Sequence, residues 1–368
     1  MGSGCRQPAA SIEWIQVSAA GDGFVQHPSG RPFVPWGFNY DHDESGRLLE
    51  QYWRREWAKV EEDFAEMRDL GANVVRIHLQ FGAFMRGPTK PDADALDQLD
   101  RLVKLAERLD LRLNLTGLGC YLKDDVPAWY DELGEAERWA AQAVFWEAIA
   151  ARCAVSPAVF CYNLMNEPVV PGGPRRPGEW LGPPFAEKYH YVQLITLDLA
   201  GRPRSEVAAA WIRTLVTRIR RHDQRRLVTV GLVPWSLDRP GLTSGFVPDV
   251  IAPELDFLSV HLYPQAGGVN EALDTLAGFA VGKPLVIEET FPLSCSFDEM
   301  RTFLRTSRRH AAGWLSFYWG QTPAEGRRSG RLQDAVIAEW LDVFTAEAQR
   351  PTDARSRPAR GRDRSGAR

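Results

Sequence analysis

Strand-like apolar runs alternate with amphipathic helical runs through most of this chain, and this order constrains the fold more than any other feature. The runs expected to form strands cover residues 33–39, 73–79, 111–115, 158–165, 227–231, 255–262, 284–288 and 313–318. The runs expected to form helices cover residues 55–70, 95–109, 135–153, 211–219 and 333–346. Eight strands separated by helices predict an α/β fold of the (β/α)8 TIM barrel type.

The structural alternative is a doubly wound sheet, which usually binds a nucleotide at a glycine-rich first turn. The chain contains neither a GxGxxG nor a Walker sequence, and this favours the barrel. We therefore expect one catalytic barrel over residues 30–348, preceded by an N-terminal extension at residues 1–29. Residues 349–368 are rich in arginine and almost free of large apolar side chains, so a disordered tail is expected there.

Composition excludes several kinds of partner and site. The net charge of −4 disfavours nucleic acid as the main partner, and no apolar run is long enough for a transmembrane helix. The five cysteines are odd in number and show no CxxC spacing, so neither a disulfide framework nor a zinc site is expected. No signal peptide is visible. The location stays open: a cytoplasmic one is expected unless upstream sequence is missing, in which case the protein is secreted or, if Ser3-Gly4-Cys5 is the remnant of a lipoprotein cleavage site, a lipoprotein.

Two of the expected strands end in glutamate, at Asn166-Glu167-Pro168 and at Glu288-Glu289. The carboxyl ends of all strands in a (β/α)8 barrel face one mouth, so residues far apart in sequence meet there. A glutamate between a dry core and a solvent-filled mouth is expected to have a raised pKa and to donate a proton near neutral pH. A pair of carboxyl groups is the smallest set of catalytic groups that cleavage of a glycosidic bond usually requires.

These strand ends resemble glycoside hydrolase family 5, within clan A of the glycoside hydrolases, over about residues 30–345. The segments that carry the resemblance are Asn73-Val74-Val75-Arg76, Asn166-Glu167-Pro168, His261-Leu262-Tyr263, Pro284-Leu285-Val286-Ile287-Glu288-Glu289 and Trp319. The resemblance implies that Glu167 is the general acid/base and that Glu289 is the nucleophile that forms a glycosyl-enzyme. Glu288 is the rival for the second role, and strand alternation is expected to point it to the opposite face.

The resemblance also implies a set of substrate-binding residues. It comprises Arg76, Asn166, His261, Tyr263 and Trp319, with Trp36, Asn39, His78 and Trp235 as further strand-end candidates. Arg76 would keep Glu289 ionised, and Asn166 would bond to the sugar 2-hydroxyl. Trp319 would form the floor beneath the reacting sugar. No cofactor is expected.

Two loops and one strand end depart from this pattern. Asp41-His42-Asp43-Glu44 looks like a metal-binding run, but the further histidines that such a site needs are absent, and a solvated polar loop is expected. Strand three carries no histidine at its end, which puts the binding set in doubt but not the two glutamates. The Pro/Gly-rich stretch at residues 170–184 is longer than a connection requires and is expected to reshape the cleft.

The leading interpretation is a retaining hydrolase of β-linked glycosides, of the β-glucan or β-mannan class, acting on an oligo- or polysaccharide. One alternative is a carbohydrate-binding barrel that has lost catalysis, which would have no need of paired carboxylates. Another is a transglycosylase that uses the same glycosyl-enzyme. The sugar, the linkage, exo or endo action and the oligomeric state stay open at this point.

Overall fold

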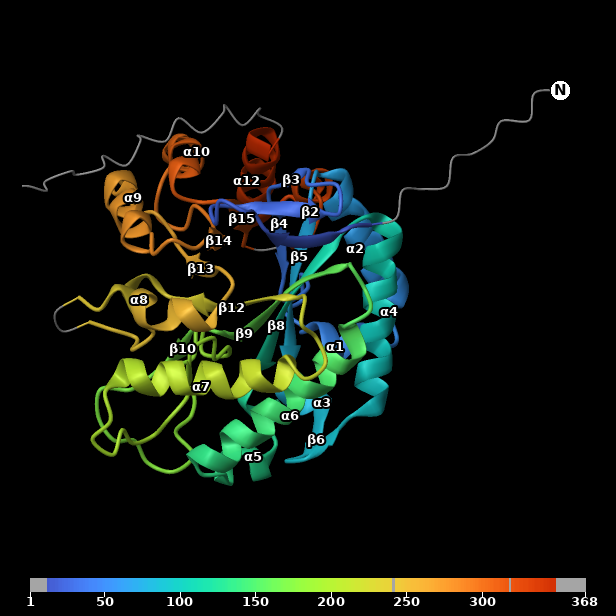
Figure 1. Ribbon diagram of the computed structural model, residues 1–368. Coiled ribbons are helices and arrows are strands. Elements are labelled where there is room, and N and C mark those ends of the chain that lie inside the picture. Colours follow the sequence, from blue (N-terminus) through green and yellow to red (C-terminus); the bar gives the residue numbers. More distant parts are fainter. Residues whose placement is uncertain (1–11, 240–241, 318, 349–368) are drawn as a thin grey trace, which may run out of the picture.

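The computed structural model describes residues 12–239, 242–317 and 319–348, and its centre is a closed barrel of eight parallel strands (Figure 1). The barrel strands are β4 (Trp36–Tyr40), β5 (Val74–Gln80), β8 (Arg112–Gly119), β9 (Val159–Asn166), β12 (Leu227–Leu232), β13 (Leu258–His261), β14 (Leu285–Thr290) and β15 (Gly313–Ser316). All eight expected strands are confirmed, and so is the (β/α)8 fold. The tail expected at residues 349–368 lies outside the described residues.

Helices surround the barrel strands (Figure 1). The longer ones are α2 (Trp57–Asp69), α4 (Ala93–Leu109), α6 (Glu135–Cys153), α7 (Arg204–Ile219), α9 (Val269–Gly278), α10 (Phe297–Thr306) and α12 (Leu332–Ala348). The short ones are α1 (Leu49–Tyr52), α3 (Phe81–Phe84), α5 (Ala128–Glu132), α8 (Pro248–Ile251) and α11 (Pro323–Arg328). Among the residues that the structure describes, no helix is both long and apolar enough to cross a membrane.

Strand β4 shows how side chains divide between the barrel interior and the helical layer. Successive side chains of a strand point to opposite faces. Asn39 faces the interior, whereas Trp36 faces the helices and stacks on Phe344 of α12, with ring centroids 4.4 Å apart. Trp36 is 5% exposed and begins its strand, so the expectation that it lines the cleft is wrong.

A small antiparallel sheet closes the amino end of the barrel. Its strands are β1 (Trp14–Val17), β2 (Phe24–His27) and β3 (Pro32–Phe33). Phe24 packs edge-on against Phe160 and Phe257, which stand at the starts of two barrel strands. The described part of the expected N-terminal extension, from residue 12, therefore contributes Ile15 and Phe24 to a hydrophobic core cluster.

The segment between β9 and α7 crosses the carboxyl ends of the strands. β10 (Pro168–Val169) pairs in parallel with β11 (Gln193–Leu194), and residues 170–192 form the crossing segment between them. The Tyr189 hydroxyl donates to the Gly46 carbonyl after β4 at 2.6 Å, and the His190 N–H donates to the Tyr121 carbonyl after β8 at 2.9 Å. The stretch expected at residues 170–184 is thus part of a longer crossing over the mouth.

Candidate active site

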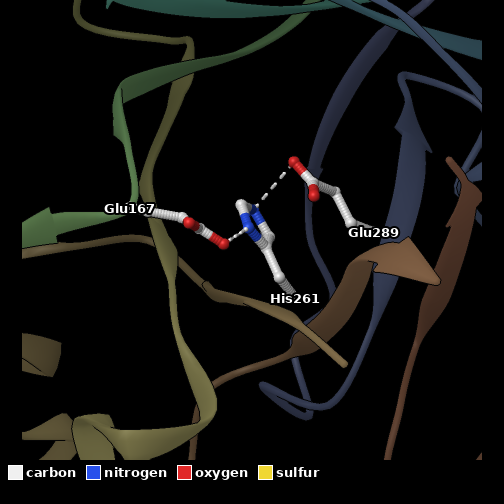
Figure 2. Close-up of side chains that lie close together, drawn as sticks. All are labelled: Glu167, His261 and Glu289. Carbon is white, nitrogen blue, oxygen red and sulfur yellow. Dashed lines mark hydrogen bonds and ion pairs between the residues drawn. The ribbon is translucent and has the colours of Figure 1, made fainter. Parts of the chain in front are cut away.

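Glu167, His261 and Glu289 lie together where β9, β13 and β14 end, and Figure 2 shows the imidazole between the two carboxylates. His261 Nδ1 is 2.9 Å from Glu167 Oε1, and His261 Nε2 is 3.5 Å from Glu289 Oε1. One oxygen of Glu167 and one oxygen of Glu289 lie within 4.8 Å of each other. The barrel therefore brings the two candidate catalytic carboxylates to one site.

Strand β14 contains one residue more than its partners at this point. In its pairing with β13 the register advances from Ile287 directly to Glu289, so Glu288 is the additional residue of a β-bulge. The pairing with β15 shows the same shift. Both glutamates consequently contact Arg76, and the expectation that Glu288 points to the opposite face is wrong.

Arg76, in β5, is fully buried and organises the groups around it. Its guanidinium donates to the carboxylate of Glu289, to Oδ1 of Asn39 and of Asn166 at 2.8 Å each, and to Oγ1 of Thr116 at 2.9 Å. Burial opposes the charge, but the neighbouring carboxylates outweigh it and raise the pKa of Arg76. A permanent cation is therefore fixed beside Glu289.

Glu288 is a buried counter-ion to this cation. None of its side chain is exposed, and the side-chain amides of Asn114 and Asn163 donate to its two oxygens. Burial raises the pKa of this carboxyl, but Arg76, His261 and Asn114 outweigh burial and lower it to about 2. Glu288 stays ionised without contact to solvent, so it cannot reach a sugar at the mouth.

Glu289 is the carboxylate of the pair that a substrate can reach, since 8% of its side chain is exposed. The Tyr263 hydroxyl donates to its Oε2 at 2.6 Å, and Arg76 donates to its Oε1. Burial raises the pKa of Glu289, while His261, Arg76 and Tyr263 oppose that rise. Its two oxygens are thus held in a fixed orientation by a cation and a hydroxyl.

His261 carries a proton on each ring nitrogen at neutral pH. Burial disfavours the charge, but Glu289, Glu167 and Glu288 outweigh burial and raise the pKa of His261 to about 9. The spacing of His261, Glu167 and Glu289 would suit a metal ion. The trio therefore places a charged imidazole between two carboxylates, an arrangement suited to proton transfer and charge stabilisation.

The backbone at Glu167 has a positive φ of 45°, which is uncommon for a residue other than glycine. Its N–H donates to the Gly231 carbonyl at 3.0 Å, and its carbonyl accepts from the Gln193 N–H at 3.4 Å. A Cβ at Gly231 would lie 3.0 Å from Nε2 of His261. The neighbouring β12 and β11 thus hold a strained turn that directs the Glu167 carboxylate toward His261.

Residues 31–319 match the family model described as cellulase (glycosyl hydrolase family 5). The chain belongs to glycosyl hydrolase family 5. The match confirms the expected family and the class of O-glycosyl hydrolases, and the fold agrees with it.

Individual relatives of this family 5 protein are distant. Mannan endo-1,4-beta-mannosidase A of Hypocrea jecorina is 24% identical over 268 residues, which span 64% of this chain and 53% of the relative. The chain therefore spans about half the length of that curated relative. The solved exo-beta-1,4-mannosidase of Opitutaceae bacterium strain TAV5 has a TM-score of 0.66 and 16% identity, with coverages of 94% of this chain and 64% of that one. The solved endo-1,4-beta-mannanase of Rhizomucor miehei has a TM-score of 0.61 and 18% identity, covering 92% of this chain and 100% of its own.

Two residues expected to bind sugar, Asn39 and His78, are buried close to Arg76. Asn39 is fully buried, accepts from Arg76 and donates to the Glu288 carbonyl at 2.9 Å. His78 is 3% exposed, and its Nδ1 is 2.6 Å from the Tyr121 hydroxyl. Burial and the charge of Arg76 lower the pKa of His78 to about 3, so its ring is neutral. Asn39 thus holds Arg76 directly, and His78 holds it through Asn39, at 3.2 Å, while sugar contacts of Asn39, His78 and Arg76 stay predictions.

Trp319, expected from the sequence to form the floor beneath the reacting sugar, lies elsewhere in the structure. It is fully buried, and its ring centroid lies 5.7 Å from that of Phe38, in the layer between strand and helices. A sugar floor at this position is therefore wrong. Phe317, two residues earlier, is partly exposed with its ring 6.5 Å from that of Tyr263, and nothing in the aromatic run itself distinguishes the two. Trp235, just after β12, is partly exposed, and its sugar contact stays a prediction.

The run Asp41-His42-Asp43-Glu44 is not the solvated loop that was expected. Asp43 is 3% exposed and accepts from the backbone of Ser45 and Arg47 at 3.0 and 2.9 Å. Asp41 is 2% exposed and accepts from His42 and from the Tyr191 hydroxyl, the latter at 3.2 Å. The carboxylates therefore build a turn at the mouth and anchor the crossing segment.

Proposed function

We propose that this protein is a retaining β-glycosidase of the β-mannan class, in which Glu289 is the nucleophile and Glu167 the acid/base. The spacing of their carboxylates carries the proposal, since one oxygen of each lies within 4.8 Å. Retaining enzymes hold their two carboxyl groups about 5–5.5 Å apart, whereas inverting enzymes need about 6.5–9.5 Å to admit a water between them. The geometry favours double displacement.

In the first step a Glu289 oxygen forms a bond to the anomeric carbon while the bond to the leaving oxygen breaks. Glu167 gives its proton to that oxygen, which leaves as an alcohol. In the second step the Glu167 carboxylate takes a proton from water, and the water oxygen replaces Glu289 on the anomeric carbon. Glu289 regains its charge and Glu167 regains its proton, so the cycle closes.

The surrounding residues support both steps. Arg76 and Tyr263 hold the Glu289 carboxylate in place. The charged His261 contacts both catalytic carboxylates, so it stabilises whichever of them is ionised as the proton moves. One amide hydrogen of Asn166 is taken by the Tyr191 carbonyl at 3.1 Å. The other can donate to the 2-hydroxyl of the reacting sugar, a contact that strengthens in the transition state.

The choice of mannan over glucan rests on the relatives. The curated relative is named as a mannan endo-mannosidase, and the two solved neighbours are named as an exo-mannosidase and an endo-mannanase. A panel of aryl β-mannosides, β-glucosides and the matching polysaccharides tests this choice. Preference for the mannoside supports it, and preference for the glucoside overturns it.

A mechanism-based label tests the roles of the two glutamates. A 2-deoxy-2-fluoro-β-mannosyl fluoride reacts with the nucleophile but releases slowly, so peptide mass spectrometry should find the sugar on Glu289. The Glu289→Ala variant is the control that should stay unlabelled. A label on Glu288 would overturn the assignment, and binding without label or turnover on every substrate would indicate a barrel that binds sugar only.

A further inference from the structure

Phe185 is a large apolar side chain left in solvent on the crossing segment over the catalytic mouth. It is 65% exposed and stands between Pro184 and the polar tip that follows. A single exposed apolar residue is common on protein surfaces and means little alone. Phe185 differs from such residues in the strained hairpin that carries it and in its contact with Tyr191.

The turn that presents Phe185 is strained. Phe185 and Tyr189 form a tight hairpin in which the Phe185 N–H donates to the Tyr189 carbonyl at 2.7 Å. The intervening Ala186 and Glu187 both have positive φ, of 48° and 58°. Such turns favour asparagine and glycine, because a Cβ is strained in this conformation. Strained backbone persists only where its surroundings hold it, and it concentrates at functional sites.

Contacts with the loop after β4 hold this hairpin. The Tyr189 hydroxyl and the Lys188 ammonium both donate to the Gly46 carbonyl, at 2.6 and 3.1 Å. A Cβ at Gly46 would lie 2.6 Å from the Tyr189 hydroxyl, so the close approach requires glycine. The hairpin is therefore docked on the rim of the barrel.

A short path of contacts joins Phe185 to the catalytic residues. Its ring centroid lies 6.1 Å from that of Tyr191, which is itself partly exposed. The Tyr191 ring stacks on Tyr189 at 5.7 Å, and the Tyr191 carbonyl accepts from Asn166, the residue before Glu167. Tyr191 thus links Phe185, through its ring, to Asn166, through its carbonyl.

We propose that Phe185 is a stacking platform for a pyranose ring of the substrate next to the one that is cleaved, an inference that rests on the proposed function. The axial C–H face of a pyranose is flat and apolar, and it matches the face of a benzene ring. The rigid hairpin presents that ring in place before the sugar arrives, which lowers the entropic cost of binding.

Steady-state kinetics on two substrates test this platform. β-1,4-mannotetraose can place a second sugar on Phe185, whereas 4-nitrophenyl β-mannoside has only the reacting sugar. Phe185→Ala should raise KM for the tetraose about tenfold, from the apolar area lost, and leave the aryl mannoside unchanged. Phe185→Trp should restore the tetraose KM, and Tyr189→Phe, which loosens the hairpin, should raise it less. Val155→Ala is the matched control, because Val155 is 84% exposed but lies between α6 and β9, at the amino end of the barrel.

If the wild type is active and Phe185→Ala has the same KM for the tetraose, the platform is overturned but the proposed function is not. Equal losses on both substrates would also overturn it, because they would indicate a general structural role. A wild type that cleaves neither substrate would overturn the proposed function and this inference with it.

Discussion

Glu288 and Glu289 are neighbours in sequence, yet both contact the guanidinium of Arg76, because β14 bulges between Ile287 and Thr290. In a regular strand two consecutive side chains point to opposite faces, so only the bulge allows both carboxylates to reach Arg76. The buried Glu288 neutralises Arg76 permanently, and the more accessible Glu289 stays within reach of a substrate.

This division predicts opposite phenotypes for two neighbouring substitutions. Glu288→Gln removes one partner of a buried ion pair, which typically costs about 3–5 kcal/mol of folding stability. Glu289→Gln should abolish activity with a smaller loss of stability. Urea unfolding and a chromogenic assay on both variants measure the two effects. A stable, inactive Glu288→Gln beside an active Glu289→Gln would exchange the roles.

Removing the acid/base should affect substrates according to their leaving groups. Glu167→Ala should slow unactivated β-mannosides about 10²–10⁴-fold, the usual worth of general acid/base assistance. Aryl mannosides with good leaving groups should be affected much less, and azide should partly restore turnover because it needs no general base. Equal slowing of both kinds of substrate, without azide rescue, would mean that Glu167 does not protonate the leaving group.

Gly231 is predicted to be essential for the geometry of the site. An added Cβ would lie 3.0 Å from His261 Nε2 and 3.3 Å from Arg76 Nη2, both of which are tightly held. Gly231→Ala should therefore lower kcat strongly while it changes the melting temperature only slightly. Gly87→Ala, whose Cβ would meet nothing closer than 4.0 Å, is the control. Unchanged kcat in Gly231→Ala would show that the trio tolerates displacement.

The raised pKa of His261 predicts a specific pH dependence of stability. The folded-state pKa is about 9, above the ordinary value of about 6.5, so the folded protein binds this proton more tightly. The resulting stabilisation is fully present below about pH 6.5 and is lost as the pH rises through 9. The difference in melting temperature between wild type and His261→Gln should therefore shrink over that range. A constant difference would mean that His261 is neutral in the folded state.

The barrel and the meeting of Glu167 with Glu289 could be predicted because their signals lie along the strands. Apolar runs of strand length mark β9 and β14, and closure of the barrel then brings Glu167 and Glu289 to one mouth. The family match over residues 31–319 agrees with the predicted barrel and family.

Side-chain direction was the part that the sequence could not supply. Trp36 and Trp319 are aromatic residues near strand termini, as a sugar platform would be, but both face the helical layer. The amino-acid sequence of β14 does not reveal its bulge, so regular alternation predicted the wrong face for Glu288. The pairing between strands decides to which face a side chain points, and this pairing cannot be read from a single sequence.

Only residues 170–184 of the crossing segment could be predicted as a loop, from their Pro/Gly content and length. Its contacts depend on backbone groups, such as the Tyr191 carbonyl that accepts from Asn166 and the Gly46 carbonyl that accepts from Tyr189. Every residue carries a carbonyl, so no residue pattern marks these positions.

The stereochemistry of the first product tests the central claim most directly. Proton NMR of a fresh reaction with an aryl β-mannoside separates the anomeric signals of newly formed β- and α-mannose before they interconvert. The spacing of Glu167 and Glu289 predicts that the β-anomer appears first. Initial formation of the α-anomer would contradict double displacement and the role of Glu289 as nucleophile.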